Sequence, residues 1–138
     1  MAGHAVIDLP LVSLDLEILD TEAGSEIIEV GAEKFRGDET LDTFSALIKP
    51  KGTLSFKIGN LTGLTARDLA NGEPLRVVLD RLSTFVGGAT IVGQSIGLDL
   101  EHLKKSGLDL TNRRFDTFEM AVLLRPRRCW GERARKNL

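Results

Sequence analysis

Several residue types are scarce in this 138-residue sequence, which has one cysteine, two histidines, one tryptophan and no tyrosine. The single Cys129 has no partner for an internal disulfide, which favours a reducing, cytoplasmic location. No apolar run approaches the ~18 residues that a membrane-spanning helix needs. The first residues also lack the charged and then apolar pattern of a signal peptide. The sequence therefore predicts a cytoplasmic protein with no membrane partner.

Charge is distributed unevenly along the chain. The formal net charge is −2, but residues 1–124 carry 12 basic and 19 acidic side chains (−7), whereas residues 125–138 carry six basic and one acidic (+5). An acidic body argues against nucleic-acid affinity from overall charge alone, and it suits a site that gathers carboxylates around metal ions. With 42% hydrophobic and 28% charged residues, the composition is that of one globular domain.

The hydrophobic pattern predicts an α/β domain with a mixed sheet. Residues 11–18, 26–35 and 40–48 alternate as strands, and their short connections indicate an antiparallel meander. Residues 89–93 form a fourth predicted strand, and helices are expected at 57–63, 65–70, 74–86, 98–106 and 116–124. For the helix over 74–86, Pro74 is expected at the first position, and its predicted apolar face includes Val77, Val78, Leu82, Phe85 and Val86.

Two carboxylates share one face of the first predicted strand. Val12, Leu14 and Leu16 alternate with Asp15 and Glu17, so the two acidic side chains project from the same side. Like charges on a packed strand are costly unless a cation compensates them, and Mg²⁺ or Mn²⁺ prefers such oxygen ligands. The alternative is that both carboxylates lie at a solvated end of the strand.

Asp99 is the third candidate, because it lies in the first turn of the helix that follows the fourth strand. Open α/β sheets build their sites at such strand-to-helix junctions, so Asp99 is expected to reach Asp15 and Glu17 if the fourth strand lies beside the first. The alternative is that Asp99 only interacts favourably with the helix dipole.

Taken together, six segments carry a resemblance: VSLDLE, EIIEVGAEKFR, LDTFSALIKP, IGNLTGLT, IVGQSIGLDLEHL and FDTFEMA. In this order and spacing they closely resemble the DEDD (DnaQ-like) 3′–5′ exonuclease family, which includes RNase T and the proofreading subunit of bacterial DNA polymerase III. The resemblance covers residues 11–124. It implies an RNase H-like fold, with an exonuclease-like domain over 1–124 and a basic tail over 125–138.

The resemblance also implies roles for particular residues. Asp15 and Glu17 match the acidic pair of the family's first motif, and Asp99 matches the aspartate of the second. In the family these residues bind two Mg²⁺ or Mn²⁺ ions that straddle the scissile phosphate. Leu61 and Thr62 match a segment that lines the pocket for the terminal nucleotide. The implied substrates are 3′ ends of single-stranded DNA or RNA, and a polymerase or helicase domain accompanies the nuclease in longer relatives.

The sequence departs from the family pattern in two places. Ile18-Leu19-Asp20 replaces the usual Thr-Thr-Gly, which leaves Ile18 only backbone contacts to the terminal nucleotide. After Asp116 there is no His, Tyr or Asp to supply the family's third motif, and neither His4 nor His102 matches it. The spacing of Asp116 and Glu119 is explained by a capping box.

These departures lead to two hypotheses. The first is a metal-dependent exonuclease whose activity as this chain is weak, since loss of a general base alone costs about 10²–10⁴-fold. The second is a non-catalytic chain, either a remnant or a module that binds nucleic acid or protein. The abrupt change to an Arg-rich end predicts a C-terminally truncated or frame-shifted product, and Trp130 in that end is either a patch on an incomplete core or a base-stacking side chain.

Overall fold

The computed structural model describes residues 9–52 and 63–124. Most of the predicted helix over 57–63 and the whole basic tail over 125–138 lie outside these residues. Within the described part no helix is long and apolar enough to cross a membrane. The elements follow in the order β1 (Leu11–Thr21), β2 (Gly24–Arg36), β3 (Glu39–Leu47), α2 (Ala66–Ala70), α3 (Leu75–Val86), β4 (Thr90–Gly93), α4 (Ile96–Lys105), β5 (Arg114–Asp116) and α5 (Thr117–Leu124).

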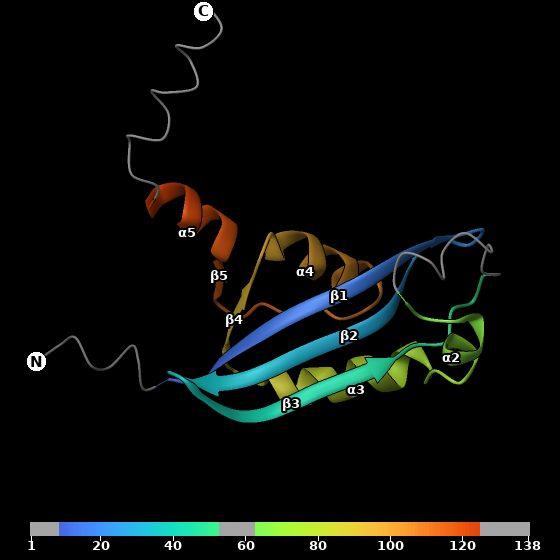
Figure 1. Ribbon diagram of the computed structural model, residues 1–138, viewed down its shortest axis with the longest axis horizontal. Helices are drawn as coiled ribbons and strands as arrows, with labels where there is room; N and C mark the ends of the chain where they lie inside the picture. The colour runs from blue at the N-terminus through green and yellow to red at the C-terminus, as the bar shows by residue number, and fades with distance from the viewer. Residues whose placement is uncertain (1–8, 53–62, 125–138) are drawn as a thin grey trace, which may run out of the picture.

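The strands form one mixed sheet in the order β3-β2-β1-β4-β5 (Figure 1). β1, β2 and β3 pair antiparallel, which confirms the predicted meander, and β1, β4 and β5 pair parallel. β1 therefore lies in the middle of the sheet, with a long antiparallel neighbour on one side and the short β4 on the other. The parallel strands bring the ends of β4 and β5 to the same edge, where α4 and α5 begin.

β1 and β2 extend further than the sequence pattern predicts. The polar segment between the first two predicted strands is mostly strand as well, because β1 continues to Thr21 and β2 begins at Gly24. Gly24 has φ 104°, a conformation that glycine adopts without the steric cost of a side chain. Polar side chains are compatible with this part of the ladder because most of them are exposed. β5 was not predicted at all, since it has three residues and no hydrophobic alternation.

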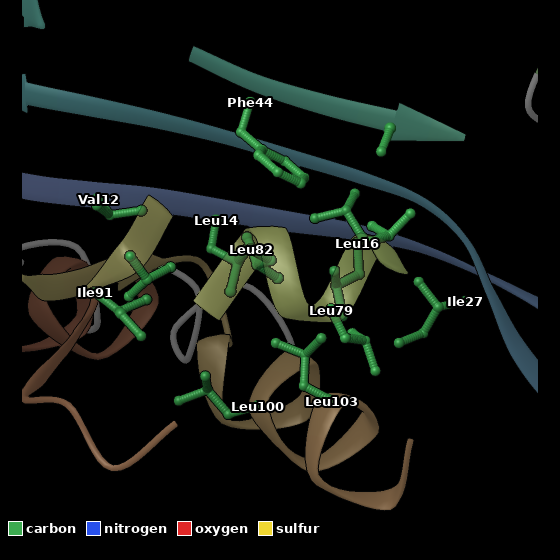
Figure 2. Packing of buried hydrophobic residues seen from close by; sticks show 14 of the residues in the cluster. Val12, Leu14, Leu16, Ile27, Phe44, Leu79, Leu82, Ile91, Leu100 and Leu103 are labelled. Carbon is green, nitrogen blue, oxygen red and sulfur yellow. The ribbon is translucent and has the colours of Figure 1, made fainter. Parts of the chain in front are cut away.

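One face of β1 forms the centre of the main core. Val12, Leu14 and Leu16 are buried and pack with Ile91 of β4 and with side chains of α3 and α4 (Figure 2). Because successive side chains of a strand point to opposite faces, Asp15 and Glu17 emerge on the other side and are exposed. The period-two pattern thus predicted correctly which side chains of β1 enter the core.

Helix α3 begins one residue later than predicted, and its buried face is rotated. Pro74 is the N-cap, with ψ 134°, so the first helical residue is Leu75. The buried residues are Val78, Leu79, Leu82 and Val86. Phe85 packs at the edge of the core, as expected, but Val77 is 46% exposed and Leu79 takes its place. A helix of this composition has apolar residues around more than half its circumference, so the sheet decides which of them are buried.

A second, smaller cluster joins the other face of the sheet to α2. The register between β1 and β2 shifts after Glu17, and beyond this bulge Leu19 and Ile28 pack with Leu69 of α2. Thr65 caps α2 in a reciprocal capping box with Asp68. Leu19 follows Asp15 and Glu17 at every second position of β1, so it points to the same face of the sheet. Helix α2, which packs on Leu19 through Leu69, therefore lies on that face as well.

Truncation of a side chain on the buried face of α3 should destabilise the protein far more than truncation of an exposed apolar side chain on α5. Leu82→Ala is expected to lower the free energy of unfolding by about 2–5 kcal/mol, because Leu82 is fully buried and the cavity cannot be filled by its neighbours. Leu123→Ala, at an 83% exposed position, should change it by less than about 0.5 kcal/mol. Urea unfolding of both variants measures the difference, and equal losses would contradict the packing described here.

Candidate active site

Asp15 and Glu17 project from the face of β1 that the helices α3 and α4 leave open. Both side chains are exposed, and Asp15 lies opposite Gly31 in the register with β2. Because Gly31 has no side chain, the space above Asp15 is not filled from the neighbouring strand. Asp15 borders an open hollow of about 430 Å³, whose walls include Ser13 and Glu33 from the sheet and Thr117 from α5.

Asp99 reaches this region through a tight turn between β4 and α4. A Cβ atom added to Gly93 would lie 2.7 Å from Cδ1 of Ile96 and 3.1 Å from the backbone oxygen of Leu14, so the turn lies directly against β1. Ser95 then adopts a left-handed conformation with φ 52° and ψ 36°, and α4 begins at Ile96. A left-handed residue with a side chain costs roughly 1–2 kcal/mol, so packing on both sides must hold this turn.

The carboxyl groups of Asp15 and Asp99 are close enough to affect each other. Partial burial raises the pKa of Asp99 to about 6, and the negative charge of Asp15 adds to the rise. Asp99, whose carboxyl has this raised pKa, lies in the first turn of α4, directly after β4 and its turn. The proximity predicted for these two residues is therefore present in the structure, although they are 84 positions apart in the sequence.

Glu17 has a different neighbourhood. In the β1–β2 register it lies directly opposite Glu29, so two carboxylates share the same face of adjacent strands. Like charges in such a pair are destabilising. Within residues 9–52 and 63–124, however, no three His, Cys, Asp or Glu side chains form a group arranged to hold a metal ion. Asp15 and Asp99 are thus close enough to interact electrostatically. Glu17 lies two residues further along β1.

The Asp15–Asp99 pair has the donor chemistry that a hard divalent cation requires. Both groups supply carboxylate oxygens, which Mg²⁺ and Mn²⁺ prefer. A cation between them would also remove the repulsion that contributes to the raised pKa of Asp99. These two residues therefore fit a divalent metal ion, and Glu17 is the nearest further carboxylate on the same strand face.

The remaining predicted site residues are Ile18, Leu61 and Thr62, and His102 was not among them. Ile18 packs its side chain against the main core, so its backbone is the part left for a ligand contact. Leu61 and Thr62 lie outside the described residues. His102 is half-buried in the last turn of α4.

Asp116 has a wider role than the capping box predicted from its spacing. Its Oδ1 accepts hydrogen bonds from the backbone N–H of Phe118 at 2.9 Å and of Glu119 at 3.4 Å, which confirms that it caps α5. The same oxygen accepts a third bond, at 3.0 Å, from the backbone N–H of Ser95 in the β4–α4 turn. Nothing in the local sequence signals this contact, because it depends on how β5 pairs with β4.

Hydrogen bonds, not a neighbouring cation, lower the pKa of Asp116. Partial burial acts to raise the pKa of its carboxyl, but backbone donors from Ser95 and the other nearby residues outweigh that effect and lower the pKa below its usual value. Asp116 thus stays ionised at neutral pH while its partners are backbone amides.

Another hollow in the described part of the chain lies away from Asp15. It measures about 610 Å³ and is bordered by the β1–β2 turn, the segment after β3 and the end of α4. Its only carboxylate, Glu26, already accepts hydrogen bonds from Thr21 and from the backbone N–H groups of Lys51 and Gly52. The carboxylate of Glu26 thus stabilises the loop over 49–52, and the lining contains no second carboxylate with which it could bind a metal ion. The smaller hollow beside Asp15 is therefore the better candidate site.

Comparison with protein families gives one match that spans most of the chain. The model of the exonuclease family named for RNase T matches residues 12–136. The PolC-type DNA polymerase III of Clostridium perfringens is 35% identical over 131 residues, and that of Thermotoga maritima is 33% identical over 128 residues. These alignments cover 90% and 89% of this chain, but the chain spans only 9% of the length of either polymerase.

Solved structures support the fold. Exonuclease X, solved with a 5′-overhanging duplex DNA, superposes with a TM-score of 0.62 at 17% identity over 85% of this chain and 65% of its own. A 3′-exonuclease solved for its recognition of a histone mRNA stem-loop gives 0.50 at 21% identity, over 64% of this chain and 37% of its own. The mixed five-stranded sheet is therefore the RNase H-like fold of exonucleases, as the sequence resemblance predicted.

The raised pKa of Asp99 predicts a specific pH dependence of stability when no metal ion is present. Between about pH 4 and pH 6 the folded protein holds a proton that the unfolded chain releases, so stability falls as the pH rises through this window. Asp99→Asn should remove the loss and, with screening of a half-exposed group, gain about 1 kcal/mol over the wild type near pH 7.5.

Urea unfolding in EDTA at about pH 4.5 and pH 7.5 measures this difference. Asp80→Asn, an exposed position on α3, is the matched control and should show no pH-dependent gain. A gain for Asp99→Asn that is the same at both pH values would rule out ionisation of Asp99 as its cause.

Proposed function

This chain belongs to the exonuclease family of the RNase T type, and from that premise we propose that it is a metal-dependent 3′–5′ exonuclease acting on the ends of single-stranded nucleic acid. The observation that supports the proposal most directly is the pairing of Asp15 with Asp99 beside an open hollow. Hydrolysis of a phosphodiester by this family needs acidic side chains at such a position.

In this proposal Asp15, Asp99 and Glu17 hold Mg²⁺ or Mn²⁺, two ions as in the family pattern. When bound, such ions activate a water molecule and stabilise the charge that develops on the phosphate and the leaving oxygen. The carboxylates themselves act by charge and position: the sheet holds Asp15, and the β4–α4 turn holds Asp99. Because both are on regular elements, little reorganisation is needed when a strand binds.

The open face of the sheet provides space for the 3′ end of a nucleic-acid strand. The hollow beside Asp15 is bordered by small or polar groups such as Gly31, Thr43 and Thr117, and also by the ring of Phe44, so it offers both polar and apolar contacts to a nucleotide. In our proposal the backbone of Ile18 and the residues Leu61 and Thr62 contact the terminal nucleotide. Because the relatives at 35% and 33% identity are DNA polymerases, DNA is the substrate we expect first.

We expect the activity of this chain to be weak. The residues after Asp116 include no His, Tyr or Asp that could act as the family's general base. A missing general base costs about 10²–10⁴-fold, whereas metal binding by the remaining carboxylates is retained. Low but metal-dependent turnover is therefore the expected behaviour.

The proposal is tested by degradation of 3′-labelled single-stranded DNA and of the matching RNA, each with Mg²⁺, with Mn²⁺ and with EDTA. Release of mononucleotides should require the metal ion and should fall by about 100-fold or more in Asp15→Asn, since even changes next to a metal ligand cost 10–100-fold. Asp80→Asn, on the opposite side of the sheet, should leave the rate unchanged.

Two outcomes would contradict the proposal. Equal rates for the wild type and Asp15→Asn would mean that the cleavage does not come from this site. No release from a folded sample with either metal ion would favour the second hypothesis, a chain that binds nucleic acid or protein without cleaving it.

A further inference from the structure

One carboxylate oxygen connects three parts of the chain next to the candidate site. Oδ1 of Asp116, at the end of β5, accepts hydrogen bonds from the N–H of Ser95 at 3.0 Å and of Phe118 at 2.9 Å. Ser95 belongs to the β4–α4 turn, and Phe118 to the first turn of α5. A single side chain thus fixes the start of α4 relative to the end of β5.

The sheet register explains why Asp116 can reach Ser95. β4 and β5 pair parallel, with Gly93 opposite Asp116, so the two strands end side by side. The chain leaves β4 at Gly93 and turns sharply at Ser95, whose left-handed conformation directs its N–H back toward β5. Without an acceptor at this point, a backbone donor in a strained turn would lose its hydrogen bond, at a cost that destabilises the turn.

The same turn determines where Asp99 lies. Helix α4 begins at Ile96, directly after Ser95, and the N–H of Leu98 donates to the backbone oxygen of Ser95 at 3.0 Å. Asp99 is the next residue, so a rotation of the turn at Ser95 would move its carboxyl relative to Asp15. On the β1 side the turn is held by the close approach of Gly93 to Leu14, and on the β5 side by Asp116.

We propose that Asp116 is a positioning residue of the candidate site: through Ser95 it holds the β4–α4 turn so that Asp99 is presented to Asp15. This inference rests on the proposed function, in which Asp15 and Asp99 bind a divalent ion. Asp116 acts as a hydrogen-bond acceptor and not as a metal ligand. Its described contacts go to backbone N–H groups, and it belongs to no metal-binding group among the described residues.

The role is tested with Asp116→Ala and Asp116→Asn, because asparagine keeps the accepting oxygen and loses the negative charge. In metal-free protein, Asp116→Ala should accelerate hydrogen exchange of the Ser95 and Leu98 amides by at least about tenfold. It should also weaken Mn²⁺ binding, measured by calorimetry, by about 10–100-fold, the usual range for residues that orient metal ligands. Asp116→Asn should restore both properties toward wild-type values.

Asp109→Ala is the matched control, since this exposed aspartate precedes β5 and forms a surface ion pair with Lys104. It should leave amide exchange at Ser95 and Mn²⁺ affinity unchanged. A folded Asp116→Ala variant with wild-type exchange and wild-type Mn²⁺ affinity would overturn the positioning role. Loss of Mn²⁺ binding in Asp116→Asn, with normal exchange at Ser95, would also overturn it, because the charge would then matter and Asp116 would be a ligand.

Failure of the proposed function gives a different result. If the wild type neither binds Mn²⁺ nor degrades nucleic acid, the exonuclease proposal is wrong. The exchange of the Ser95 and Leu98 amides in metal-free protein still decides whether Asp116 holds the turn.

Discussion

The alternation of side chains along β1 is the constraint on which both the core and the candidate site depend. Val12, Leu14 and Leu16 are buried on one face against α3 and α4, and this burial leaves Asp15 and Glu17 on the other. A slip of one residue in the pairing of β1 would exchange the two sets and bury the carboxylates in the apolar core. The hydrophobic packing that stabilises the sheet therefore also specifies where the acidic groups emerge.

The unfavourable contributions of the candidate site to the free energy of folding arise near the point where β4, β5 and α4 meet. Asp15 and Asp99 repel each other, and Ser95 has a backbone conformation that residues with side chains rarely adopt. Both are unfavourable for folding in the absence of a cation, so the neighbouring core and the hydrogen bonds to Asp116 must offset them. Strain and like charges at one point of an otherwise regular sheet are typical of a functional site, and the family to which the chain belongs supplies the chemistry that would use them.

Particular residues show how far sequence reasoning extends. The first three strands were predicted, although not the full length of β1 and β2, and so was the face of β1 from which Asp15 projects, because a half-buried strand has a clear period of two. On α3 the pattern predicted that Val77 is buried, but Leu79 is buried in its place. A helix rich in apolar residues has more than one possible buried face, and the sequence does not distinguish between them. β5 was missed because a strand of three residues is too short to show a hydrophobic pattern. The metal-binding roles of Asp15, Glu17 and Asp99 stay a prediction, and the structure pairs only the first and the third.

Most of the local elements, the two faces of β1 and, through the order of its motifs, the exonuclease family can be predicted from the amino-acid sequence. These follow from periodicity and residue type, which act over a few neighbouring positions. The electrostatic interaction of Asp99 with Asp15 and the hydrogen bond from Ser95 to Asp116 depend on the tertiary structure. Both contacts join residues far apart in the chain, and they depend on strand order and register, which are set by the packing of the whole sheet and not by any single segment.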